Sequence, residues 1–247
     1  MESQIKEVAN LIKNSKYTVA FTGAGISVES GIPTFRGSQG LWSKYDPEEY
    51  AYIEAFLRNP SKVWKMLREM YEVILSAKPN PAHKVLSELE KVGYLKTVIT
   101  QNIDGLHQEA GSRNVIEFHG NCKWLFCLNC GKREKIDRKL ISRLPYPECP
   151  DCKAPLKPEV VFFGEPIPFN AKIMAEEEAK NCEVMLIIGT SGVVYPAAEL
   201  PYIAKTKGAK IVEINLEETP YTSSITDYFL QGKASEILEK IFSKLKI

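Results

Sequence analysis

Four of the six cysteines form two pairs whose spacing constrains the middle of the chain. Two residues separate Cys127 from Cys130 and Cys149 from Cys152, and eighteen residues lie between the pairs. Two such knuckles present four thiolates in the tetrahedral arrangement that Zn²⁺ prefers. A four-thiolate shell leaves the metal no open position for substrate, so we expect one structural zinc in a ribbon module. Free buried cysteines and redox activity are the weaker alternatives.

The remaining cysteines and the absence of long apolar runs indicate the compartment. Cys122 and Cys182 have no partner in this pattern and are expected to be small core residues. Thiolates clustered for metal binding are typical of a reducing compartment. Residues 1–16 have apolar side chains at helical spacing, and the longest aliphatic run, residues 184–188, is too short to span a bilayer. We expect a cytoplasmic protein with no membrane partner.

The numbers of basic and acidic residues in the chain are almost equal, and this limits the kinds of partner that it can attract. Its 247 residues include 32 Lys and Arg against 31 Asp and Glu. A field without a dominant sign does not recruit polyanions, so we expect no direct nucleic-acid partner. The hydrophobic content of 44% is enough for a full-sized core.

Aliphatic runs of strand length alternate with segments of helical periodicity. The runs are residues 17–22, 95–100, 115–118, 184–188 and 209–214. This alternation predicts an α/β fold with a doubly wound, Rossmann-like parallel sheet. Oligomeric state cannot be predicted from this pattern.

Two segments interrupt the alternation and look like insertions. Residues 47–77 read as helices punctuated by Pro60, and residues 121–158 contain the zinc module and several prolines. We therefore expect residues 1–46, 78–120 and 159–247 to form the Rossmann-like domain. The helical module and the zinc ribbon are expected to form a smaller inserted domain.

A glycine-bearing loop follows the first predicted strand. Gly23, Ala24 and Gly25 lead to Ser27, and a helix is expected to follow and to offer amide donors to a phosphate. The ordinary dinucleotide fingerprint has its third glycine where this chain has Val28. The loop therefore indicates a dinucleotide site, with a simple glycine turn as the alternative.

Polar residues follow the other predicted strands. Ligands of open α/β sheets bind beyond the carboxyl ends of the strands, so these residues are candidates to line one crevice. Helix capping and turn formation are the alternative roles of several of them. The candidates are Gln101, Asn102, Ile103, Asp104, His119, Gly189, Thr190, Ser191, Asn215, Leu216 and Glu217.

Three histidines are available as groups that titrate near neutrality. His83 and His107 lie in predicted helices and are expected to be packing residues. His119 stands at a strand end and is followed by glycine, so it is the best candidate for a general base.

Several segments resemble sirtuin motifs and occur in sirtuin order. They are residues 23–27, 31–37, 100–104, 118–120 and 163–165, and the four-cysteine module falls where sirtuins carry zinc. The resemblance covers essentially the whole chain. It implies an NAD-dependent protein lysine deacylase that releases nicotinamide and free lysine and moves the acyl group onto ADP-ribose.

The resemblance also implies roles for individual residues. His119 would deprotonate a ribose hydroxyl, and Asn102 would orient ribose and water. The pocket for nicotinamide would be lined by Ala24, Ile32, Phe35, Ile103 and Asp104, with Asp104 holding the amide. Other contacts with NAD are assigned to Gly23, Gly25, Ser27, Thr34, Arg36, Trp42, Gln101, Gly189, Thr190, Ser191, Asn215, Leu216, Glu217 and Lys233. Thr34 stands where many members have aspartate.

The acylated peptide would add as a strand between two loops. Contacts are assigned to Val161, Phe163, Gly164, Glu165, Val193, Val194 and Tyr195. Members adapted to acidic acyl groups carry tyrosine and arginine where this chain has Leu67 and Met70. A buried carboxylate without a cationic partner is costly, so we expect acetyl or apolar acyl groups rather than succinyl. Simple packing of Leu67 and Met70 in the helical core is the alternative.

Two other functions remain as alternatives. Mono-ADP-ribosyl transfer to protein uses the same co-substrate and breaks the same bond. A non-catalytic zinc-ribbon binding protein is the second, although a polar crevice is not needed for such a role.

Overall fold

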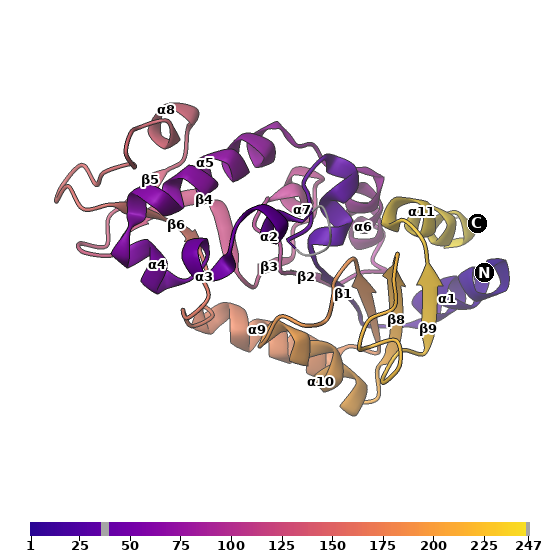
Figure 1. The fold of residues 1–247 in the computed structure, drawn as a ribbon. Coiled ribbons are helices and arrows are strands. Elements are labelled where there is room, and N and C mark those ends of the chain that lie inside the picture. Colours follow the sequence, from indigo (N-terminus) through magenta and orange to yellow (C-terminus); the bar gives the residue numbers. More distant parts are fainter. Residues whose placement is uncertain (36–39, 246–247) are drawn as a thin grey trace.

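The computed structural model describes residues 1–35 and 40–245 and consists of two lobes (Figure 1). The large lobe is built on a six-stranded sheet with strand order β3-β2-β1-β7-β8-β9, and every neighbouring pair is parallel. Its strands are β1 (Thr18–Thr22), β2 (Thr97–Thr100), β3 (Val115–Glu117), β7 (Val184–Ile188), β8 (Lys210–Asn215) and β9 (Tyr228–Gln231). The doubly wound α/β fold predicted from the sequence is confirmed.

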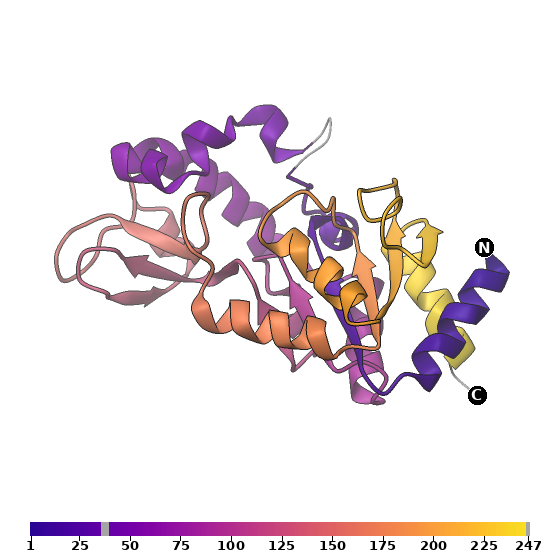
Figure 2. The same cartoon turned by 90° about the horizontal axis from the view of Figure 1, so that it is seen from below.

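Helices cover both faces of this sheet because its strands are apolar on both sides. One face packs against α1 (Glu2–Asn14), α6 (Pro81–Lys91) and α11 (Ala234–Leu245). The other face packs against α9 (Phe169–Asn181), η2 (Ala197–Glu199) and α10 (Leu200–Thr206). Figure 2 shows α9 running from the small lobe toward the large lobe, and α1 and α11 side by side at the far end of the large lobe.

The small lobe combines a helical module with a three-stranded antiparallel sheet of order β5-β4-β6. The strands are β4 (Gly120–Cys127), β5 (Arg133–Lys135) and β6 (Leu156–Val160), and α8 (Arg138–Ile141) lies beside them. The helices are α2 (Leu41–Lys44), α3 (Pro47–Tyr50), α4 (Ile53–Arg58) and α5 (Pro60–Ser76). A hydrophobic core that includes Trp64, Leu67 and Leu156 joins the two parts.

Pro60 was expected to punctuate the helices of residues 47–77, and this is confirmed, because α4 ends at Arg58 and α5 begins at Pro60. Proline suits the first position of a helix because the amide hydrogen that it lacks would have no partner there. Asn59 precedes it and accepts a hydrogen bond from the Lys62 amide at 3.0 Å. The short helices η1 (Ala24–Ser30) and α7 (Leu106–Glu109) follow β1 and β2. None of the helices in residues 1–35 and 40–245 is both long and apolar enough to cross a membrane.

Candidate functional site

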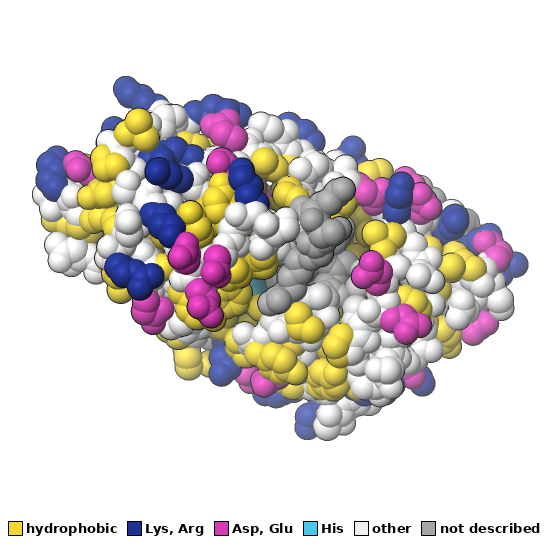
Figure 3. Space-filling model, viewed as in Figure 1, with side chains coloured by type: hydrophobic (Ala, Val, Ile, Leu, Met, Phe, Trp, Pro, Cys, Tyr) yellow, Lys and Arg dark blue, Asp and Glu magenta, His cyan; other side chains and the backbone are white. Residues whose placement is uncertain are grey.

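A cavity of about 840 Å³ lies where the two lobes meet, at the carboxyl ends of the central strands. Figure 3 shows this hollow with hydrophobic side chains along its rim. Gly23 follows β1, Gln101 follows β2, Gly189 follows β7 and Asn215 ends β8, and all four residues line the cavity. The strand order reverses between β1 and β7, which is where open α/β sheets bind ligands.

Most of the residues assigned from the sequence lie on the wall of this cavity. They are Gly23, Ala24, Gly25, Thr34, Phe35, Trp42, Leu67, Met70, Gln101, Asn102, Ile103, His119, Val161, Phe163, Gly164, Glu165, Gly189, Thr190, Ser191, Val194, Tyr195, Asn215, Leu216, Glu217 and Lys233. Four assigned residues are not on the wall: Ser27, Ile32, Asp104 and Val193. Arg36 lies outside the described residues.

The glycine loop presses against the loop that follows β7. A Cβ atom on Gly25 would lie 2.7 Å from the Gly189 Cα, and one on Gly23 would lie 2.8 Å from the Thr190 Cβ. Neither position has room for a side chain, so these glycines allow two backbone segments to approach each other. The interpretation as a simple turn does not explain this close contact.

A helix was expected to follow the glycine loop, and the structure has one there, of the 3₁₀ type. Residues 24–30 form the 3₁₀ helix η1, with the Ile26 amide donating to the Gly23 carbonyl at 3.2 Å. A short segment held tightly at its first turn by Gly25 favours this narrower helix. The Gly25 amide in its first turn donates to the Gly189 carbonyl at 2.8 Å.

A buried hydrogen-bond network fixes the Asn102 side chain at the cavity wall. The Asn102 amide nitrogen donates to the Gly23 carbonyl and to Ser27 Oγ, both at 3.1 Å. Ser27 Oγ donates in turn to Asp104 Oδ2 at 2.7 Å, and His83 Nε2 lies 3.4 Å from the same hydroxyl. Asn102 is therefore held in one orientation relative to the glycine loop.

Asp104 occupies the inner layer of this network. Its Oδ1 accepts a hydrogen bond from the Leu106 amide at 2.9 Å, while Oδ2 accepts from Ser27. Burial raises the pKa of the Asp104 carboxyl above its usual range. The hydrogen bond from the Leu106 amide lies at the start of α7, so Asp104 also has the capping role that was considered as the alternative.

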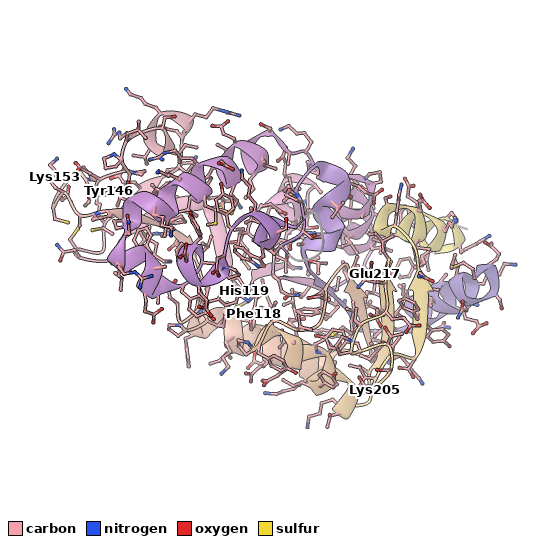
Figure 4. The ribbon with its side chains drawn as sticks, in the orientation of Figure 1. Phe118, His119, Tyr146, Lys153, Lys205 and Glu217 are labelled. Carbon is pink, nitrogen blue, oxygen red and sulfur yellow. The ribbon has the colours of Figure 1, made fainter. Side chains whose placement is uncertain are left out.

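His119 combines a position on the cavity wall with a fixed imidazole orientation. Its Nδ1 lies 3.2 Å from the Gln101 carbonyl oxygen, so donation from Nδ1 leaves Nε2 as the nitrogen that can accept a proton. Burial lowers the pKa of His119, although the Gln101 carbonyl opposes this shift. The lowered pKa extends the range in which the imidazole is neutral toward lower pH. Figure 4 labels His119 between the lobes.

The other two histidines lie inside the large lobe. His83 and His107 are at most 1% exposed, and their rings meet edge to face with centroids 4.9 Å apart. His107 Nε2 lies 3.0 Å from Thr22 Oγ1, and burial lowers the pKa of His83 to about 4. Neither ring lines the cavity.

Side chains at the ends of β2, β7 and β8 are tied together by hydrogen bonds. Gln101 Nε2 donates to Thr190 Oγ1, and Asn215 Nδ2 donates to the Thr190 carbonyl, both at 2.9 Å. Glu217 lies further along the same rim, beyond β8 (Figure 4). The loops after these strands therefore form one polar wall of the cavity.

The helical module supplies an apolar wall opposite His119. Leu67 is 1% exposed and belongs to the core of the small lobe, while Met70 is partly buried beside it. Both side chains line the cavity together with Met66. Among the described residues, Lys233 is the only lysine or arginine on the cavity wall, and it precedes α11 at the far side of the sheet.

The loop of residues 161–165 borders the cavity and forms backbone hydrogen bonds with the segment of residues 51–53. The Phe163 amide donates to the Ala51 carbonyl at 2.9 Å, and the Phe163 carbonyl accepts from the Ile53 amide at 3.0 Å. Both backbone groups of Phe163 are therefore engaged.

The four-cysteine module has the geometry of one tetrahedral metal site. The four sulfur atoms lie within 4.8 Å of one another, and three of the separations are 3.5, 3.5 and 3.6 Å. Zn–S bonds of about 2.3 Å in a tetrahedron place sulfur atoms about 3.8 Å apart. Cys127, Cys130, Cys149 and Cys152 thus fit one zinc ion. Cys122 and Cys182 are buried elsewhere, as expected.

The cavity wall includes residues that the sequence analysis did not assign. They are Val28, Glu29, Pro33, Leu41, Tyr50, Ala51, Met66, Val160, Phe162, Ile167, Pro196, Ile214, Glu218, Thr219, Pro220, Gly232 and Ala234. Pro33 and Phe162 lie inside or beside quoted motifs and could have been found that way. Gly232 and Ala234 follow β9, a strand that the hydrophobic pattern did not reveal.

The parallel sheet has its ligand cavity at the switch point and is joined to a zinc ribbon. These two features define the class of Rossmann-like α/β proteins with a structural metal module. The Sir2 family model matches residues 23–196. The "NAD-dependent protein deacylase" of Pyrococcus furiosus is 51% identical over 97% of both chains. The chain therefore belongs to the Sir2 family of enzymes.

Two solved structures of Sir2 proteins show the same fold. A Sir2 homologue in complex with NAD is 46% identical, has a TM-score of 0.90, and is matched over 97% of this chain and 93% of the other. A Sir2 variant with deacetylated p53 peptide and 3′-O-acetyl ADP ribose is 40% identical, with a TM-score of 0.92 and coverage of 97% and 98%. These ligands belong to those two proteins.

Proposed function

We propose that this Sir2-family enzyme removes acyl groups from protein lysines and uses NAD as its co-substrate, with nicotinamide, O-acyl-ADP-ribose and free lysine as products. The observation that carries the proposal is the single cavity that joins the glycine loop, a neutral histidine and an apolar wall. The named activity of the Pyrococcus furiosus relative and the ligands of the two Sir2 structures support the same reaction.

NAD, His119 and Asn102 have different roles in the proposed reaction. NAD supplies the activated ribose carbon that accepts the acyl oxygen when nicotinamide leaves. His119, with Nδ1 donating to the Gln101 carbonyl, accepts a ribose hydroxyl proton at Nε2. Asn102 orients ribose and water, since its side chain is held by Gly23 and Ser27.

The other assignments are proposed on the same basis. Gly189, Thr190 and Ser191 meet the phosphates, while Asn215, Leu216, Glu217 and Lys233 hold the adenosine end. Phe35 and Ile103 line the nicotinamide pocket. Asp104, one layer behind the cavity wall, holds the amide of nicotinamide. The peptide binds between residues 161–165 and 192–195, since residues 161–165, Val194 and Tyr195 line the cavity.

The proposal also covers the two domains of the protein, its cellular location and its partners. Residues 1–46, 78–120 and 159–247 are proposed as the NAD-binding domain, and residues 47–77 and 121–158 as the small domain. The two lobes have separate hydrophobic cores, and Leu41, Trp42 and Tyr45 pack with the core of the small lobe. The free thiols and the four-cysteine site favour a reducing, cytoplasmic location. The near-neutral net charge favours peptide over nucleic-acid partners.

The proposed reaction is tested by incubating the protein with NAD and an acetyl-lysine peptide. We expect peptide-dependent release of nicotinamide, and mass analysis is expected to find deacetylated peptide and O-acetyl-ADP-ribose. A peptide that gains the mass of ADP-ribose would support the mono-ADP-ribosyltransferase instead. Without nicotinamide release, the protein would be a binding module.

We also expect a preference for acetyl-lysine over succinyl-lysine. Leu67 and Met70 offer the acyl end no cation, and a carboxylate that loses water without a charged partner is costly. Matched peptides should therefore differ in kcat/KM by at least about tenfold, with acetyl faster. Faster succinyl removal would contradict the assignment.

A paired variant distinguishes this preference from simple core packing. Leu67→Tyr combined with Met70→Arg places a hydroxyl and a cation on the apolar wall, and is expected to raise the succinyl-to-acetyl ratio of kcat/KM by about tenfold or more. The control is Leu67→Met, which keeps the wall apolar and should leave the ratio unchanged. An unchanged ratio in the paired variant would mean that these residues only pack the core.

A further inference from the structure

A buried lysine connects the zinc module to the peptide side of the cavity. Lys157 lies in β6, and this strand runs directly into the loop of residues 161–165. The Lys157 side chain is 5% exposed, and its Nζ lies 2.8 Å from Oε2 of Glu165, which is 20% exposed. Among the ion pairs of the described residues, this one is the most deeply buried.

All three ammonium protons of Lys157 have acceptors inside the protein. Besides Glu165, Nζ donates to the Pro158 carbonyl at 3.1 Å and to the Val160 carbonyl at 2.7 Å. It also lies 4.4 Å from the centroid of the Phe162 ring, within the range of a cation–π contact. An ammonium group has three donors, so Lys157 has none left for a ligand.

Glu165 uses the same carboxylate oxygen to close the loop. Its Oε2 accepts a hydrogen bond from the Phe162 amide at 2.8 Å, and the Glu165 amide donates to the Phe162 carbonyl at 3.0 Å. Gly164 stands between them at φ +86°, a conformation that suits a tight turn. Lys157 therefore holds the acceptor that keeps the 162–165 turn closed.

This turn is also linked to the proposed general base. The Val161 amide donates to the His119 carbonyl at 2.9 Å, and residues 160–165 all line the cavity. A shift of the turn would therefore move the peptide side of the cavity directly. The strand ends proposed to face NAD belong to the other lobe, and within the described part of the chain they make no hydrogen bond or ion pair with Lys157.

We propose that Lys157 is a positioning residue for the peptide: through Glu165 it fixes the 161–165 turn in the shape that receives the acyl-lysine strand. The inference rests on the proposed deacylase function. Removing one partner of a buried ion pair leaves an uncompensated charge, which would seek water and open the turn. The effect should fall on peptide binding and spare NAD binding.

The test uses the full-length, zinc-loaded enzyme and four variants. Lys157→Met keeps the length of the side chain and removes its charge, Lys157→Arg keeps the charge, and Glu165→Gln removes the acceptor charge. Lys135→Met is the matched control, because Lys135 is an exposed lysine on β5 of the same sheet. Peptide KM, NAD KM, kcat and zinc content are measured for each.

We expect Lys157→Met and Glu165→Gln to raise the peptide KM by at least about tenfold, with the NAD KM and the zinc content unchanged. Lys157→Arg and Lys135→Met should stay close to the wild type. Adding Glu165→Gln to Lys157→Met should worsen the peptide KM by less than the product of the single effects, because both changes open the same turn.

If the wild type is active, any one of three results would overturn the inference about Lys157. They are an unchanged peptide KM in Glu165→Gln, an equal rise of both KM values, and an arginine variant as impaired as the methionine variant. Glu165→Gln decides the matter if Lys157→Met does not fold. A wild type without peptide-dependent nicotinamide release would instead remove the proposed function itself.

Discussion

Replacing His119 by alanine is expected to lower the rate of deacylation by about two to four orders of magnitude. The imidazole lines the cavity, its Nδ1 is held by the Gln101 carbonyl, and burial keeps it neutral. Among the described residues, no other histidine lines the cavity. The measurement is kcat for deacetylation of an acetyl-lysine peptide at saturating NAD.

Two controls separate loss of the base from loss of the fold. The base acts after nicotinamide has left, so the variant should still exchange labelled nicotinamide into NAD in the presence of peptide. Its zinc content and thermal midpoint should match those of the wild type. Deacylation at the wild-type rate would show that another group removes the proton.

The pH dependence of the wild type gives a second check on the same residue. His119 must be unprotonated to accept a proton, and burial moves its pKa below the usual value of 6.5. A lowered pKa keeps the base available in mild acid, so the acid limb of kcat/KM should have its midpoint below about 6.5. A midpoint above that value would contradict the assignment.

Removal of zinc is expected to abolish activity through unfolding of the small lobe. Structural zinc contributes about 10 to 16 kcal/mol of apparent binding free energy in isolated modules, which is comparable with the whole stability of a domain. The four sulfurs belong to β4 and to the loops around β5 and β6. Because β6 leads into residues 161–165, loss of the module would also disorder the peptide side of the cavity.

Cys149→Ser and treatment with a strong chelator should have the same effect. Both should release one zinc ion per chain, make the segment 121–158 sensitive to protease, and remove deacylation. Cys182→Ala is the matched control, because Cys182 is also buried but lies at the end of α9, far from the metal site. A metal-free protein that stays folded and active would contradict the structural role.

Features decided by short stretches of sequence were predicted well. The strand at residues 184–188 has the predicted bounds, and the other four predicted strands begin and end within two residues of the prediction. A continuous aliphatic run between polar ends leaves few alternatives to a buried strand. The two cysteine pairs were equally clear because ligand type and spacing are local chemical properties.

Features decided by contacts between distant residues were not predicted. β9 (Tyr228–Gln231) is a four-residue edge strand, too short for its periodicity to stand out, and its pairing with β8 reveals it. The 3₁₀ form of η1 depends on the contact of Gly25 with Gly189. Asp104 was expected on the cavity wall, but its hydrogen bonds to Ser27 and Leu106 place it one layer behind.

The sequence by itself determined the parallel sheet and the four cysteines of the metal site, and it predicted His119 rather than His83 or His107 as the histidine of the site. Each depends on residue type, hydrophobic period or a position next to a strand. Only the tertiary structure decided that Lys157, an ordinary lysine in the sequence, is buried against Glu165. The cost of burying a charge depends on the partners that the fold brings to it, and those partners are not set by neighbours in the chain.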